Sequence, residues 1–141
     1  MALTTLDIKE PGLNVLPPGV ERHSVNMGGL TGLQIFPDDQ IEVINEEGNQ
    51  ICEIICFDKN GKSELGILSL KENCKKSFIK EILHNDEESS LITKLQLKKR
   101  NLNINNSKSS IIFDKDSLSG EKVKLKSKDK CYVIFSAPKN E

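Results

Sequence analysis

Short apolar runs that end at turn-forming residues dominate this chain and restrict it to a fold built mainly from β-strands. The clearest run, residues 51–57, is rich in isoleucine and aromatic side chains and is followed by Asp58-Lys59-Asn60-Gly61, where Asn-Gly is a strong signal for a tight turn. Side chains alternate between the two faces of a strand, and both faces of this run are mostly apolar. We therefore expect a central strand that is covered on both sides. Glu53 is the exception, and we expect its carboxylate to reach solvent or a lysine.

Two further runs come before this strand. Residues 33–36 end at Pro37-Asp38-Asp39, which predicts a type I turn with proline at its second position. Residues 41–44 alternate in polarity and lead into a loop in which Gly48 can supply a positive φ. The three runs predict an antiparallel meander over residues 20–66.

The middle of the chain changes to a helical period. Between Leu70 and Leu83 the apolar residues recur at steps of three and four, with lysine and glutamate on the other face, which predicts an amphipathic helix. A second helix is expected from Leu91 to Arg100, although residues 95–97 also fit a strand. We assign residues 67–100 to a helical insertion.

Strand patterns return after a polar loop that begins at residue 101. Residues 110–113, 123–126 and 131–135 are separated by segments with turn-forming residues, and they predict a second meander over residues 101–141. The expected fold class is mainly β (α+β): an antiparallel β-barrel or sandwich of two meanders with one or two inserted helices. The whole chain is expected to form one β domain, and it can equally be complete or the N-terminal part of a longer protein.

The N-terminal segment, residues 1–19, is expected to be an extended arm. Its prolines and glycines, Pro11, Gly12, Pro17, Pro18 and Gly19, exclude a helix and restrict any strand to the edge of a sheet. The segment lacks the basic and apolar regions of a secretory signal. With four cysteines in the chain and three of them inside apolar runs, we expect a cytoplasmic protein with reduced thiols.

The charge balance excludes two classes of partner. Twenty basic and twenty-one acidic residues give a net charge of −1, and the chain has few arginines, so we expect no nucleic-acid ligand. Its apolar runs are shorter than the roughly 20 residues that cross a bilayer, so we expect no membrane partner.

The sequence predicts no catalytic residues and no metal site. The two histidines, His23 and His84, lie outside any recognisable catalytic motif. Cys52 and Cys56 have a spacing found in zinc sites, but on a strand they stand about 13 Å apart, too far to hold one ion or to form a disulfide. The glycine-rich residues 28–32 precede a strand and lack a P-loop motif, which favours a bend.

A polar contact surface is the site that we predict. Gly48, Asn49 and Gln50 form an amide-rich turn between core strands, with Glu53 close by in the sequence. Such a turn presents several hydrogen-bond donors and acceptors at a fixed place, so these four residues are the candidate ligand-binding residues. The alternative is that the turn serves only to reverse the chain.

Two stretches resemble a known family. Residues 36–50, Phe-Pro-Asp-Asp-Gln-Ile-Glu-Val-Ile-Asn-Glu-Glu-Gly-Asn-Gln, are similar to the opening of the urea-carboxylase-associated family. They also resemble a related β domain in front of some aminomethyltransferases of the glycine-cleavage T-protein type. In that group the domain closes with patterns similar to residues 113–120 and 131–138.

The resemblance implies an accessory or small-molecule-binding domain without catalysis of its own, in an aminomethyltransferase-like protein of folate-dependent one-carbon metabolism. Tetrahydrofolate would belong to the parent protein and no cofactor to this chain. The implied partner is a C-terminal transferase domain or a second copy of the chain. The metal-binding cysteine and histidine cluster of the urea-carboxylase-associated family has no counterpart here. The alternative is a small stand-alone cytoplasmic enzyme with a site built from separate loops.

Overall fold

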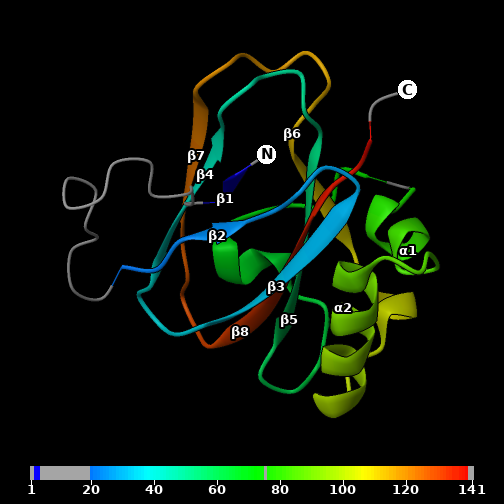
Figure 1. Ribbon diagram of the computed structural model, residues 1–141. Coiled ribbons are helices and arrows are strands. Elements are labelled where there is room, and N and C mark those ends of the chain that lie inside the picture. Colours follow the sequence, from blue (N-terminus) through cyan, green and yellow to red (C-terminus); the bar gives the residue numbers. More distant parts are fainter. Residues whose placement is uncertain (1, 4–19, 75, 140–141) are drawn as a thin grey trace.

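Two antiparallel four-stranded sheets form the body of the protein (Figure 1). The structure is a computed structural model, and it describes residues 2–3, 20–74 and 76–139. One sheet has the strand order β2-β1-β4-β7 and the other β3-β8-β5-β6. The strands are β1 (Ala2–Leu3), β2 (His23–Ser24), β3 (Gly29–Ile35), β4 (Gln40–Asn45), β5 (Cys52–Asp58), β6 (Ser109–Phe113), β7 (Glu121–Lys126) and β8 (Cys131–Ala137). The predicted fold class is confirmed, and of its two architectures the sandwich is the one observed.

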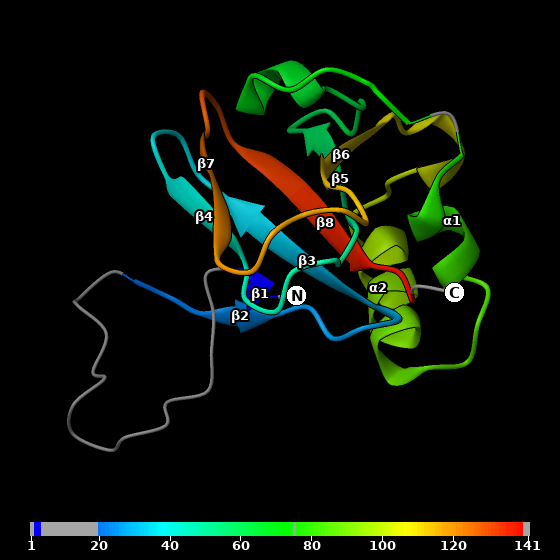
Figure 2. The ribbon, with the colours of Figure 1, turned by 90° about the horizontal axis from the view of Figure 1, so that it is seen from above.

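The helices lie in the insertion between β5 and β6. They are α1 (Phe78–Ile82) and α2 (Glu88–Lys99), with 3-10 turns η1 (Leu65–Leu68) before them and η2 (Ile104–Asn106) after them. Viewed from above, α1 and α2 lie beside the β3-β8-β5-β6 sheet, on the side away from β4 and β7 (Figure 2). The layers are therefore sheet, sheet and helices. Among the described residues, no helix is long and apolar enough to cross a membrane.

The predicted strands exist, but the predicted meanders are wrong. β3 pairs with β8 from Gly29↔Ala137 to Ile35↔Cys131, β4 pairs with β7, and β5 lies between β8 and β6. The turns after β3 and β4 therefore lead from one sheet to the other. A turn signal fixes the local reversal of the chain but not the partner of each strand. Burial decides the partners, because β8 is buried along its whole length and must be central.

The local turns agree with the sequence in two of three places. Gly48 has a φ of 78° and Gly61 a φ of 83°, and Asp58 N donates to Lys62 O (2.7 Å) around the Asn-Gly turn. The third turn is of type II and not type I, because Asp38 at its third position has a φ of 70°. In this conformation Asp38 N donates to Ser127 O (2.8 Å), a contact with the turn after β7.

The helix predicted for residues 70–83 is much shorter. Only Phe78–Ile82 is helical, because the residues before it bind the edge strand β6. Asn73 accepts from Ile111 N through its side-chain oxygen (2.6 Å), and Cys74 forms a β-bridge with Ser109. Ser77 then starts the helix by accepting from Lys80 N (3.2 Å). The second predicted helix is confirmed as α2.

The expected N-terminal arm falls mostly outside the described residues, since residues 1 and 4–19 are not among them. Ala2 and Leu3 are described, and they form β1 between β2 and β4. For these two residues the expected arm is wrong, because they pair on both sides.

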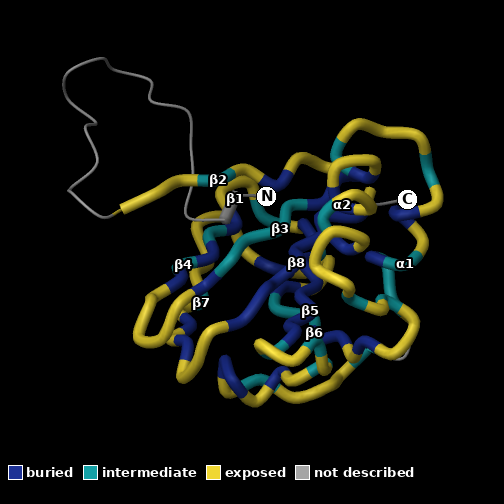
Figure 3. The backbone as a smooth tube through the Cα atoms, turned by 90° about the horizontal axis from the view of Figure 1, so that it is seen from below, coloured by how far each residue is buried: buried dark blue, intermediate teal, exposed yellow. Residues whose placement is uncertain are grey.

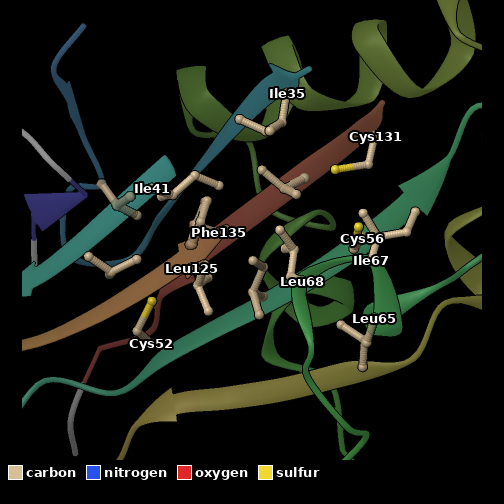
Figure 4. Close-up of a cluster of buried hydrophobic side chains, with 14 of the residues drawn as sticks. Ile35, Ile41, Cys52, Cys56, Leu65, Ile67, Leu68, Leu125, Cys131 and Phe135 are labelled. Atoms are coloured by element: carbon tan, nitrogen blue, oxygen red, sulfur yellow. The ribbon is translucent and has the colours of Figure 1, made fainter. Parts of the chain in front are cut away.

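The core consists of two clusters on the two faces of the β3-β8-β5-β6 sheet. Cys52, Ile54 and Cys56 belong to the cluster between the sheets, in which Figure 4 labels the two cysteines. Ile55 and Phe57 lie under the helices. The predicted alternation of β5 and its central position are therefore confirmed. The tube in Figure 3 shows β8 buried, with exposed loops around the sheets.

Candidate functional site

The predicted contact turn, Gly48-Asn49-Gln50, connects β4 in one sheet with β5 in the other. Gly48 and Asn49 have left-handed φ values of 78° and 55°. A Cβ atom on Gly48 would lie 2.6 Å from the backbone nitrogen of Ser119, so the loop between β6 and β7 leaves room only for glycine. Asn49 N donates to Ser117 O (2.7 Å) in the same loop. The turn is thus packed against another part of the chain.

Three buried side chains, Asn45, Gln50 and Ser117, hold this turn, and we call them the amide clamp. Asn45 Nδ2 donates to Gln50 O (3.2 Å) and Ser117 Oγ (2.5 Å), and Asn45 Oδ1 accepts from Gly48 N (2.9 Å). Gln50 Nε2 donates to Pro138 O (2.8 Å), just after β8. The side-chain amide of Gln50 therefore has a structural role. Asn49 is exposed and Gly48 half-buried, and ligand binding by the turn stays a prediction.

Glu53 does not reach solvent or a lysine, so that expectation is wrong. Its side chain has an exposed fraction of zero and faces the start of α1. The carboxylate accepts from Ser77 Oγ (2.8 Å), Ile79 N (2.7 Å) and Ser136 Oγ (3.2 Å). Three donors offset the cost of removing the charge from water. Glu53 thus fixes α1 to the sheet, and its partners are different from those of the amide clamp.

All four cysteines are free thiols. The surroundings of Cys52, Cys56 and Cys74 favour the protonated form, whereas hydrogen bonds with Cys56 and Ser127 lower the pKa of Cys131 to about 7. Burial raises the pKa of Cys52, and a hydrogen bond with Cys131 together with burial raises the pKa of Cys56. Cys74 is half-buried, and burial and the charge of Glu53 raise its pKa as well. Because the thiolate is the nucleophile, these three cysteines are poorly suited to covalent catalysis.

The histidines lie apart from these thiols. His23 Nε2 contacts the carboxylate of Glu21 (3.2 Å), and His84 is exposed after the end of α1. Among residues 2–3, 20–74 and 76–139, no three histidine, cysteine, aspartate or glutamate side chains come together in a group that could hold a metal ion.

A second polar cluster, which no sequence pattern predicted, lies on the outer face of β3. The Arg100 guanidinium lies 4.2 Å from the centroid of the Tyr132 ring, and its Nη1 donates to Gln34 Oε1 (2.7 Å). Gln34 Nε2 in turn donates to Cys131 O (2.8 Å). One signal was available: the chain has a single tyrosine, and polar aromatic residues are enriched in binding sites. The contact between Arg100 and Gln34 could not be predicted from the sequence, since the two residues are 66 positions apart.

The comparisons with known proteins give a distant relation to part of a larger enzyme. No protein-family model matches the chain, and no solved structure matches it. The chain is similar to trimethylamine-oxide aldolase of Ruegeria pomeroyi, with 29% identity over 131 residues. The aligned region covers 93% of this chain but only 17% of the aldolase.

Proposed function

We propose that this chain acts as an accessory domain without catalysis of its own in a larger enzyme that acts on a methylated amine or its oxide. The observation that carries the proposal is the match to trimethylamine-oxide aldolase, which includes nearly all of this chain and about one sixth of that enzyme. A sequence that corresponds to such a small share of an enzyme is well explained as one of its domains.

The geometry supports a scaffold role. The amide clamp ties the turn before β5 to the loop after β6 and to the end of β8, and Glu53 ties α1 to β5. Buried polar groups that are fully bonded make a fold rigid and specific. The raised thiol pKa values of Cys52, Cys56 and Cys74 argue against a covalent role for these residues.

The sequence resemblance implies tetrahydrofolate for a parent enzyme. We propose no tetrahydrofolate-binding residue in this chain. The side-chain amide of Gln50 in the predicted contact turn already donates to two carbonyl groups of the chain.

An activity measurement on the isolated chain tests the absence of catalysis. The purified chain is incubated with trimethylamine oxide, with and without tetrahydrofolate, and the amine oxide is followed by proton NMR. We expect no consumption under either condition. Consumption that depends on enzyme concentration would favour a stand-alone enzyme and overturn the accessory role.

A chimera tests the relation to a larger enzyme. The matching 131 residues of the Ruegeria pomeroyi aldolase are replaced by this chain, and an aldolase that lacks the segment serves as the control. We expect the truncated aldolase to lose activity and the chimera to regain at least part of it. A folded chimera that is as inactive as the truncated aldolase would contradict the proposal.

A further inference from the structure

A hollow between β3 and α2 has a volume of about 640 Å³. Arg100, Tyr132, Gln34 and Gln96 provide its polar groups, and Phe36 and Ile92 are among its apolar lining residues. Phe36 and Ile92 are 52% and 51% exposed, so both offer apolar surface to a ligand in the hollow. Figures 1 and 2 both show α2 running beside β3. The hollow thus combines open apolar surface with converging polar groups, which is the composition of a small-molecule site.

The guanidinium of Arg100 is held in one orientation before any ligand arrives. Its face stacks on Tyr132 at 4.2 Å, Nη1 donates to Gln34 Oε1 (2.7 Å), and Nε donates to Gln96 Oε1 (3.3 Å). Gln34 is itself fixed by the carbonyl of Cys131 (2.8 Å). Fixing a charged group in advance lowers the entropy cost of binding, and a planar guanidinium can bind a carboxylate through two parallel hydrogen bonds.

The position of Tyr132 depends on a glycine in the neighbouring strand. A Cβ atom at Gly32 would collide with the Tyr132 hydroxyl oxygen, so the missing side chain of Gly32 lets the phenol lie across β3. Burial raises the pKa of Tyr132, and the charge of Arg100 offsets part of that rise. The hydroxyl therefore stays protonated at neutral pH and can donate to an anion.

The charges around Arg100 favour an anion. Among the described residues, no carboxylate lies within ion-pair distance of its guanidinium. A smaller hollow of about 320 Å³ shares Arg100, Gln34 and Tyr132 with the first, and Lys59 and Lys130 line it. One acid lines each hollow, and neither pairs with Arg100: Glu21 contacts His23 in the larger hollow, and Asp58 accepts from the backbone of its own turn in the smaller one.

We propose that this hollow binds a small carboxylate with an apolar tail. The carboxylate lies on the Arg100 guanidinium beside the Tyr132 hydroxyl, and the tail lies against Phe36 and Ile92. Arg100 is the one basic residue among those that line this hollow, which matches the single charge of a carboxylate better than the nearly double charge of a phosphate monoester. This binding does not depend on the proposed accessory function, because the isolated chain contains the whole hollow.

Tyrosine fluorescence reports on this site, because Tyr132 is the one tyrosine of a chain without tryptophan. Hexanoate, 1-hexanol and n-hexyl phosphate are titrated into the purified chain at constant ionic strength. We expect a saturable change with hexanoate and binding at least tenfold weaker for 1-hexanol, the loss expected when a charge-assisted hydrogen bond is removed. The phosphate is expected to bind no more tightly than hexanoate.

Three variants assign the binding to Arg100. Arg100→Gln should weaken hexanoate binding at least tenfold, and Arg100→Lys should weaken it less because the charge remains. Lys98 is exposed in the last turn of α2, and Lys98→Gln should change the affinity by less than about twofold because surface charges are screened. Circular dichroism confirms that each variant is folded. Equal binding of hexanoate and hexanol, tighter binding of the phosphate, or unchanged binding by folded Arg100→Gln would overturn the proposal.

Discussion

Two glutamines bind the two ends of β8, one as part of the buried core and the other as part of an exposed cluster. Gln50 donates to the carbonyl of Pro138 just after the strand, and Gln34 donates to the carbonyl of Cys131 at its start, both at 2.8 Å. Gln50 is buried within the amide clamp, so its side-chain amide bonds only to other groups of the chain. The amide oxygen of Gln34 instead orients the exposed guanidinium of Arg100. The same chemistry thus supports the fold at one end and a candidate binding site at the other.

The largest expected effect is the loss of stability in Gly48→Ala. An alanine there has a left-handed φ, which costs about 1–2 kcal/mol, and its Cβ lies 2.6 Å from Ser119 N, which adds an overpacking cost of about 1–3 kcal/mol. The matched control is Gly120→Ala, because Gly120 has a φ of 80° but nothing within 4 Å of its Cβ position. Urea denaturation measures both variants. Equal losses would show that the loop does not restrict the turn.

A smaller loss is expected when the amide clamp loses one member. Asn45→Ala removes the side-chain partner of Gly48 N and one of the two donors to Gln50 O, and leaving a polar group such as Gly48 N without its partner costs about 1–3 kcal/mol. Asn106→Ala, at an exposed position of η2, should change the free energy of unfolding by less than about 0.5 kcal/mol. If Asn45→Ala is as stable as Asn106→Ala in urea, the clamp contributes nothing to the fold.

The cluster at the other end of β8 should matter little for stability. Arg100 is exposed, so Arg100→Gln loses mainly its stacking on Tyr132, worth about 0.5–1 kcal/mol. The same urea experiment checks the value. A loss as large as that of Asn45→Ala would mean that Arg100 supports the fold in the way the clamp does, and the contrast between the two ends would disappear.

The smallest expected effect is a shift in the titration of Tyr132. Burial raises its pKa, and the positive charge of Arg100 opposes that rise. Arg100→Gln removes the opposing charge, so the phenol should stay protonated to a still higher pH. Ultraviolet absorbance of the tyrosinate measures this directly, because no other tyrosine is present. A lower pKa in the variant would contradict the position of Arg100 over the ring.

The sequence predicted the features that depend on neighbouring residues. It did not predict those that depend on contacts between segments far apart in the chain. The strands and the turns at Gly48 and Gly61 follow from nearby residues, and they are confirmed. The strand partners depend on which strand is buried on both faces, and the late start of α1 depends on Asn73 binding β6. A lone carboxylate was expected to reach water, but Glu53 finds donors on α1 and β8, which only the folded chain brings together.

The candidate site divides in the same way. Gly48, Asn49, Gln50 and Glu53 are adjacent in sequence and could be proposed as a group, but the structure turns Glu53 toward α1 and Gln50 toward Pro138. The Arg100 cluster combines Gln34 of β3, Tyr132 of β8 and Arg100 directly after α2, so no local pattern in the sequence could have indicated that these three residues meet.

One measurement compares both regions in a single experiment. Two-dimensional ¹H–¹⁵N NMR spectra of the labelled chain are recorded during a titration with hexanoate, with 1-hexanol as the control. We expect hexanoate to shift the signals of Gly32, Gln34 and Arg100 and to leave those of Gly48, Asn49 and Gln50 unchanged. Shifts confined to the Gly48–Gln50 turn would contradict this distinction. They would mean that the ligand binds at the turn that the sequence first indicated.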